Sequence, residues 1–108
     1  MDIQLKRGLL EICVLAAIKN EESYGYRIIK DVAPFVEISE STLYPILRRL
    51  EAGELLTVRS AEHNGRLRKY YQITAAGRAR LAEFTSEWSE MMAIYRFVIK
   101  EGNTDEQE

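Results

Sequence analysis

The chain of 108 residues is poor in the side chains that build metal centres, disulfide frameworks and catalytic sites. It contains one cysteine, one histidine, one tryptophan and two prolines. A lone cysteine excludes an intrachain disulfide or a cysteine-based metal site, and Cys13 in its apolar surroundings is interpreted as a buried small hydrophobe. His63 has no identifiable catalytic partner, and no nucleophile motif or phosphate-binding glycine loop is present. We therefore expect no enzyme, no metal and no cofactor.

The chain also lacks a hydrophobic run of the roughly 20 residues that a membrane-spanning helix needs. Its apolar segment at residues 8–18 is interrupted by Glu11 and is not followed by a small-residue cleavage site. These features argue against a signal peptide and a membrane partner and predict a cytoplasmic protein. The composition, 46% hydrophobic and 30% charged, is typical of one soluble domain of this length.

The net charge of −2 hides a separation of charge along the chain. Residues 41–80 hold eight basic and three acidic side chains (8 − 3 = +5), whereas residues 81–108 hold two basic and seven acidic ones (2 − 7 = −5). A local excess of positive charge is typical of a phosphate-facing surface, but ordinary solvated surfaces also carry charge. Charge alone leaves both interpretations open.

Hydrophobic periodicity predicts three helices in the first half of the chain. The first, about residues 3–19, is apolar on two stripes, which favours cover by a partner subunit as well as by its own domain. The second, about residues 24–33, is expected to be capped by Ser23 and stopped by Pro34. The third is expected to be capped by Ser39. Its predicted buried residues are Leu43, Ile46, Leu47 and Leu50.

Two residues of the third helix are unusual for a helix. Pro45 removes a backbone hydrogen bond, at a cost of about 3 kcal/mol in a helix interior, so we expect a tightened or bent start. Gly53 lies near the C-terminal end, where a left-handed cap is expected. The polar face of this helix carries Ser41, Tyr44, Pro45 and Arg48.

A basic hairpin is predicted directly after this helix, because apolar and polar residues alternate on two strands. Asn64-Gly65 supplies the positive φ of a turn, and the tip, residues 62–67, is expected to be mobile and longer than a minimal loop. A helix followed by a basic hairpin is the layout of a winged helix-turn-helix, which places a helix in the DNA major groove and a ribbon beside it. The inward-facing strand residues are Leu56, Val58, Tyr71 and Ile73.

A long helix is predicted from Ala75 to about Lys100, after a Thr74 cap. Its apolar residues recur at spacings of 3, 4, 3, 4 and 3, which is a heptad seam. Because the helix is longer than a small domain can cover, we favour a homodimer through this seam, helped by the first helix, over packing within one domain. The seam residues are Leu81, Phe84, Trp88, Met91, Tyr95 and Val98.

The expected organisation therefore has three parts. Residues 1–74 form a winged helix-turn-helix domain, and residues 75–100 form a dimerisation helix. Residues 101–108 form an acidic tail that is expected to be disordered.

Four segments resemble the short subfamily of PadR transcriptional regulators: LKRGLLEICVLAAI, SYGYRIIK, STLYPILRRLEAGELL and GRLRKYYQITAAGRARL. They cover nearly the whole chain, and the most specific pieces are residues 41–45 and 68–71. The resemblance implies a mainly α (α+β) fold, a dimeric winged helix-turn-helix with a C-terminal dimerisation helix. It also implies a bacterial DNA-binding regulator, typically a repressor of stress, efflux or detoxification genes that often releases DNA when a small molecule binds. Pro45 belongs to the family motif.

The resemblance also assigns candidate DNA contacts. Residues of the third helix match positions near base edges or phosphates, Tyr24 matches a phosphate-contacting position at a helix N-terminus, and the wing adds salt-dependent affinity. The expected partner is double-stranded DNA with an inverted repeat, which matches the symmetry of a homodimer. Tyr70 and Tyr71 are interpreted as sheet packing. The candidate DNA-binding residues are Tyr24, Ser41, Thr42, Tyr44, Arg48, Gly65, Arg66, Arg68 and Lys69.

Some family members carry a tryptophan at the position that matches Trp88, where two copies flank a hydrophobic pore that binds planar drugs. Trp88 and Met92 are therefore candidate residues for a small hydrophobic or planar effector. The heptad spacing explains Trp88 equally well as part of the dimer seam. Two further alternatives are a winged-helix module that binds protein and a drug sensor with a secondary role on DNA. The basic wing argues against the first of these.

Overall fold

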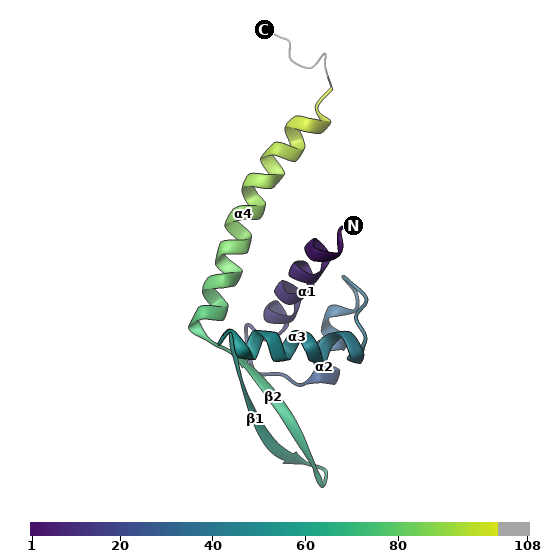
Figure 1. The fold of residues 1–108 in the computed structure, drawn as a ribbon, viewed down its shortest axis with the longest axis vertical. Coiled ribbons are helices and arrows are strands. Elements are labelled where there is room, and N and C mark those ends of the chain that lie inside the picture. The colour runs from purple at the N-terminus through teal and green to yellow at the C-terminus, as the bar shows by residue number, and fades with distance from the viewer. Residues whose placement is uncertain (102–108) are drawn as a thin grey trace.

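The computed structural model describes residues 1–101, as three helices, a hairpin of two strands and a long final helix (Figure 1). This is the predicted mainly α (α+β) winged helix-turn-helix, and its long C-terminal helix is confirmed. The part of the expected tail from residue 102 onward lies outside the described residues. The elements are α1 (Ile3–Ala17), α2 (Gly25–Val32), α3 (Glu40–Ala52), β1 (Leu56–His63), β2 (Arg66–Ile73) and α4 (Ala75–Ile99).

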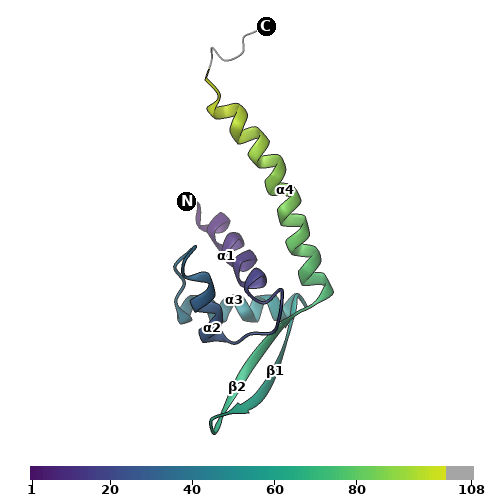
Figure 2. The ribbon, with the colours of Figure 1, turned by 180° about the vertical axis from the view of Figure 1, so that it is seen from behind.

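The hairpin and α4 extend from the small body formed by α1, α2 and α3 (Figure 1). The antiparallel strands reach away on one side, and α4 leaves on the other, with its first part beside α1 (Figure 2). Gly77 in the first turn of α4 is buried, and a Cβ atom there would collide with the backbone oxygen of Leu55. The missing side chain therefore lets α4 start close against the base of the hairpin.

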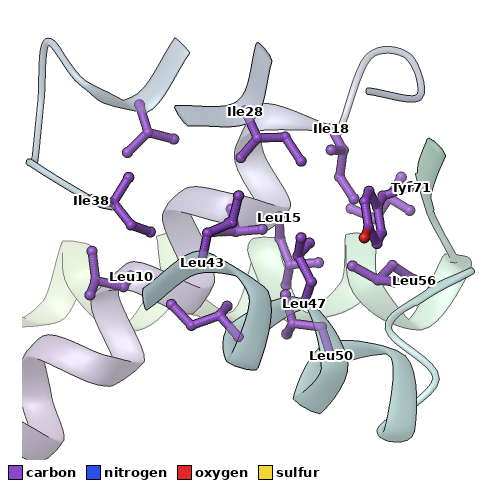
Figure 3. Packing of buried hydrophobic residues seen from close by; sticks show 14 residues of the cluster. Leu10, Leu15, Ile18, Ile28, Ile38, Leu43, Leu47, Leu50, Leu56 and Tyr71 are labelled. Atoms are coloured by element: carbon purple, nitrogen blue, oxygen red, sulfur yellow. The ribbon is translucent and has the colours of Figure 1, made fainter. Parts of the chain in front are cut away.

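The core is built around the inner face of α3 (Figure 3). The predicted buried residues of α3 are all at most 2% exposed, and residues from α1, α2 and both strands pack around them. Of the two apolar stripes predicted on α1, the one with Leu10, Val14 and Ile18 faces this core. Leu5, on the other stripe, is 50% exposed. The N-terminal part of this second stripe is thus left without cover in the single chain, whereas Ile12 further along it is 8% exposed.

The N-terminus of α3 is capped as predicted. The Ser39 hydroxyl accepts a hydrogen bond from the Thr42 amide at 3.3 Å. The same amide donates to the Ser39 carbonyl at 3.2 Å, a spacing of three residues that tightens the first turn. Pro45 then lies inside the helix without ending it. The expected tight start of this helix is therefore present.

The C-terminal cap of α3 differs from the prediction. Gly53 has φ −84° and is not left-handed, whereas Glu54 has φ 63°. The Leu55 amide donates to Leu50 and the Glu54 amide donates to Glu51, both at 2.9 Å, which together form a Schellman motif. The left-handed position therefore falls one residue after the glycine, and Glu54 occupies it despite the cost of that conformation for a residue with a Cβ atom.

The hairpin turn is shorter than predicted. Asn64 at φ 53° and Gly65 at φ 80° form a two-residue turn between His63 and Arg66, which are paired across the strands. The expectation of a longer tip was wrong because strand pairing continues up to His63 and Arg66. This end of the hairpin lies beyond the core, so neither face of its strands needs apolar residues.

The predicted cap of α2 was also wrong. Tyr24 is the N-cap residue and makes no side-chain cap hydrogen bond. Ser23 is 2% exposed, and its backbone pairs with Tyr71 of β2, through hydrogen bonds of 3.0 and 2.7 Å. Its hydroxyl has no hydrogen-bond partner within the described residues. The segment before α2 is thus fixed to the hairpin, which sets the position of the wing relative to the helices.

Candidate nucleic-acid interface

Two neighbouring grooves follow the outer face of α3. One, of about 490 Å³, lies between the N-terminal ends of α2 and α3 and strand β2. The other, of about 340 Å³, lies between α3 and the hairpin and includes Arg48. Tyr44, Lys69 and Tyr71 line both, so the two grooves adjoin. Helix α3 and the wing therefore present one joint concave surface.

The first turn of α3 presents ordered hydroxyl groups. Ser41 and Thr42 are both exposed, and their hydroxyls lie 3.0 and 3.2 Å from that of the cap residue Ser39. One cap thus orients two of the predicted contact residues. Hydroxyls at this end of a recognition helix can donate to or accept from base edges and phosphates.

Tyr44 lies across the N-terminus of α2. Its side chain is 37% exposed, and a Cβ atom built on Gly25 would collide with its hydroxyl. Gly25 therefore allows the tyrosine to lie directly against the backbone of α2. This contact fixes the ring between the two helices at the floor of the larger groove.

Arg68 of the wing reaches back to α2. The central carbon of its guanidinium lies 3.6 Å from the ring centroid of Tyr24, a cation–π contact. The Nε and Nη2 groups donate to the Tyr70 hydroxyl at 3.0 and 2.8 Å. The rings of Tyr24 and Tyr70 meet edge to face, with centroids 6.0 Å apart. Arg68 is accordingly half-buried and held by both tyrosines.

A second arginine continues this cluster. The guanidinium carbon of Arg59 lies 4.6 Å from the Tyr70 ring centroid, and both ends of its fork bond the Glu22 carboxylate, with an Nε to Oε1 distance of 3.0 Å. The hydrogen bonds from Arg59 hold the pKa of Glu22 below its usual value, and the same contact raises the pKa of Arg59. Both groups thus stay charged at neutral pH.

The charge count over residues 41–80 therefore overstates the cations available to a partner. Arg59 is paired with Glu22, and Arg49 is paired with Glu11 at 3.1 Å. Within residues 1–101, the side chains of Arg48, Arg66 and Lys69 make no hydrogen bond or ion pair, and all three residues are exposed. Unpaired positive charge therefore remains on the outer face of α3 and on the wing, and also on Arg78 and Arg80 at the start of α4.

The structure groups most of the predicted DNA-binding residues, but not all of them. Tyr24, Tyr44, Arg68 and Lys69 line the larger groove, whereas Gly65 and Arg66 lie at the far tip of the hairpin. Tyr71 is 5% exposed, and burial raises the pKa of its hydroxyl, which fits the packing role predicted for it. Sequence reasoning missed four residues of the larger groove, and among them Glu40 could have been found from its position next to the helix cap. The missed residues are Gly25, Tyr26, Glu40 and Leu67.

Helix α4 carries a separate apolar surface. The Phe84 and Trp88 rings stack with centroids 5.8 Å apart, and Leu81 packs against the core. Beyond Trp88, the predicted seam is open: its residues are 50–70% exposed. Ile94 and Phe97 are also exposed, and the heptad pattern missed them. The open seam residues are Met91, Tyr95 and Val98.

Across residues 1–101, no three or more histidine, cysteine, aspartate or glutamate side chains lie together as a metal-binding group. None of the helices described here has the length and hydropathy to cross a membrane.

The fold and the shared groove define a winged helix-turn-helix protein. Residues 14–83 match the model of the transcriptional regulator PadR-like family. The chain therefore belongs to this family of transcriptional regulators, which confirms the resemblance seen in the sequence.

Proteins similar to this chain include a relative found by sequence and regulators of known structure. A transcriptional regulator of Mycobacterium tuberculosis is 33% identical over 81 residues, which are 74% of this chain and 76% of the relative. A PadR-like transcription factor of Bacteroides fragilis superimposes with a TM-score of 0.80 at 32% identity, over 88% of this chain and 94% of its own. PadR of Bacillus subtilis, solved in complex with operator DNA, has a TM-score of 0.67 at 23% identity, over 71% of this chain and 47% of its own.

The contact between Gly25 and Tyr44 gives a prediction for stability. Gly25→Ala should lower the free energy of unfolding by about 1–3 kcal/mol, because the new methyl group displaces the Tyr44 ring. Chemical denaturation measures the change. Adding Tyr44→Phe removes the nearest colliding atom and should recover part of the loss. If the double variant is less stable than Gly25→Ala alone, the collision is not the cause.

Proposed function

We propose that this protein is a homodimeric, sequence-specific DNA-binding transcriptional regulator that acts as a repressor at a palindromic operator. The observation that carries the proposal is the joint surface of α3 and the wing, where Arg48 and Lys69 line the two adjoining grooves together with Tyr44. Family membership and the operator complex of the Bacillus subtilis neighbour support it. No enzymatic activity is proposed.

In this proposal, α3 reads base edges and the wing binds the backbone. Ser41, Thr42 and Tyr44 project from the exposed face of α3, which suits direct readout in the major groove. Arg48, Arg66 and Lys69 carry exposed charges that suit phosphate contacts. The first amides of α2 lie beside Tyr24 without a side-chain cap, so they can also donate to a phosphate.

The dimer is proposed to form through α4. An exposed run of large apolar side chains on a helix that extends beyond its domain is a surface that a monomer rarely leaves uncovered. The repeat of 3 and 4 residues suits helix–helix packing, and the exposed N-terminal end of α1 with Leu5 is available to the same partner. A two-fold dimer then matches an inverted repeat with half-sites about one helical turn apart. This role also places the protein in the cytoplasm, where bacterial DNA lies.

Selection from a random duplex library at two salt concentrations tests the proposed function. We expect enrichment of a palindrome, with an affinity that falls as salt rises. A folded protein that enriches no sequence would favour the protein-interaction alternative. Repression is then tested by transcription in vitro from a promoter that contains the selected site: added protein should reduce the transcript, and an increase would identify an activator.

Two substitutions test the division of work between α3 and the wing. Tyr44→Ala should weaken binding to the selected duplex more than to a scrambled one, because it removes a base-reading side chain. Lys69→Ala should weaken binding to both duplexes and lower the slope of log K against log salt by about one unit. Fluorescence anisotropy titrations measure both effects. If Tyr44→Ala loses the same factor of affinity for the selected and the scrambled duplex, this division is contradicted.

Two substitutions on α4 test the dimer seam. Tyr95→Glu places a charge within the apolar stripe and should give monomers, because burying an unpaired charge is costly. Ala93→Glu is the matched control, since at 100° per residue position 93 lies on the opposite side of the helix. Sedimentation velocity should find dimers for the wild type and for Ala93→Glu. Dimers of Tyr95→Glu at micromolar concentration would place the interface elsewhere.

A small planar effector is a second candidate function, supported by the stacked Phe84 and Trp88 rings. Trp88 is 40% exposed, and Met92 is half-buried close by on the same helix. A planar aromatic compound could insert where two such pairs face each other in a dimer. Titration with such compounds should quench Trp88 fluorescence and weaken DNA binding at the same concentration. Quenching without any change in DNA affinity would mean that no effector response exists.

A further inference from the structure

We propose that Tyr70, anchored by Arg59 and Glu22, is a positioning residue that holds Arg68 as a preformed phosphate-binding fork. The inference rests on the proposed DNA-binding function and deepens it. The cluster joins the segment before α2 to both strands of the wing: Glu22 and Tyr24 come from that segment, Arg59 from β1, and Tyr70 from β2.

The geometry leaves part of the Arg68 guanidinium free. Stacking on Tyr24 uses one face of the plane, and the Tyr70 hydroxyl accepts from Nε and Nη2. The remaining N–H groups have no hydrogen-bond partner within residues 1–101. Arg68 lines the larger groove beside Lys69 and the N-terminal residues of α2. The unused edge of a planar fork is the part that binds a phosphate oxygen pair.

Arg68 differs in this respect from the other wing cations. Arg66 and Lys69 are exposed and have no such support, so each must lose rotamer freedom when it binds a phosphate. Arg68 is half-buried, and its rotamer is already fixed by two tyrosines. A group that is ordered before binding loses less entropy on binding. Its contribution to affinity should therefore depend on Tyr70, whereas that of Lys69 should not.

Tyr70 is itself held from its other side. Arg59 lies over its ring, and Arg59 is in turn fixed by the bidentate pair with Glu22. Glu22 directly precedes Ser23, whose backbone bonds Tyr71 of β2. The segment before α2 is thus connected to the hairpin twice, through the backbone from Ser23 to Tyr71 and through side chains from Glu22 by way of Arg59 to Tyr70. This arrangement sets the distance between the Arg68 fork and the end of α2.

Tyr70→Phe is the main test, because it deletes the acceptor for Arg68 but keeps the aromatic ring. On the full-length protein, we expect about 3- to 10-fold weaker binding to both the selected and the scrambled duplex, with a lower salt slope. The thermal unfolding temperature should change little. Arg68→Lys keeps the charge but cannot form the stacked fork, so it should lose affinity to a similar extent.

Double variants separate positioning from simple loss of charge. If Tyr70 acts through Arg68, then Tyr70→Phe with Arg68→Lys should bind no more weakly than Arg68→Lys alone. Tyr70→Phe with Lys69→Ala is the control, and there the two fold-losses should multiply. The inference is overturned if the losses multiply in both pairs, if Tyr70→Phe binds as the wild type does, or if its unfolding temperature falls in step with its affinity. If the wild type binds no duplex at all, the proposed function fails together with the inference.

Discussion

The burial of one face of α3 is the constraint on which the rest of the structure depends. Because Leu43, Ile46, Leu47 and Leu50 all point into the core, the residues between them must face outward. The helix can therefore carry an exposed polar face without weakening its own packing. Pro45 fits this arrangement because the helix is held by its buried side chains as well as by its backbone hydrogen bonds. Packing thus supplies the rigidity that the proposed DNA-reading surface requires.

The wing depends on a different kind of contact, since most of the hairpin lies beyond the core. The backbone bridge between Ser23 and Tyr71 and the aromatic cluster above it connect the hairpin to the helices. The arginines of this region consequently divide into two groups. Arginines paired with carboxylates, such as Arg59, connect parts of the domain. Those without a paired carboxylate, such as Arg66, have an accessible charge that a negatively charged partner can bind. The Ser23 hydroxyl has no hydrogen-bond partner among residues 1–101, so backbone pairing with Tyr71 accounts for the position of Ser23.

Sequence patterns predicted the elements well where a buried face repeats, as in α3 and at the base of the hairpin. They failed where the backbone alone decides the outcome. Glycine preference pointed to Gly53, but the Schellman hydrogen bonds place the left-handed residue at Glu54. Residues 62–67 were predicted to form a tip longer than a minimal loop, whereas strand pairing continues to the turn. Arg68 contacts Tyr24, which is far away in the sequence, as well as Tyr70. A contact between such distant residues leaves no local sequence pattern from which it could be predicted.

The start of α4 connects the proposed DNA-binding surface to the proposed dimer and effector surface on α4. Gly77 lets the first turn of α4 rest on the Leu55 backbone, and the Thr74 hydroxyl donates to the Glu54 carbonyl at 2.8 Å. Both contacts lie at the junction of α3 and the hairpin, so the direction of α4 is fixed relative to the groove. In the proposed dimer, the packing of two α4 helices would then set the separation and angle of the two α3 helices. A molecule that wedged the seam apart near Trp88 would change that separation without touching the DNA-facing surface. Because an operator has a fixed half-site spacing, even a small change at the seam would weaken binding.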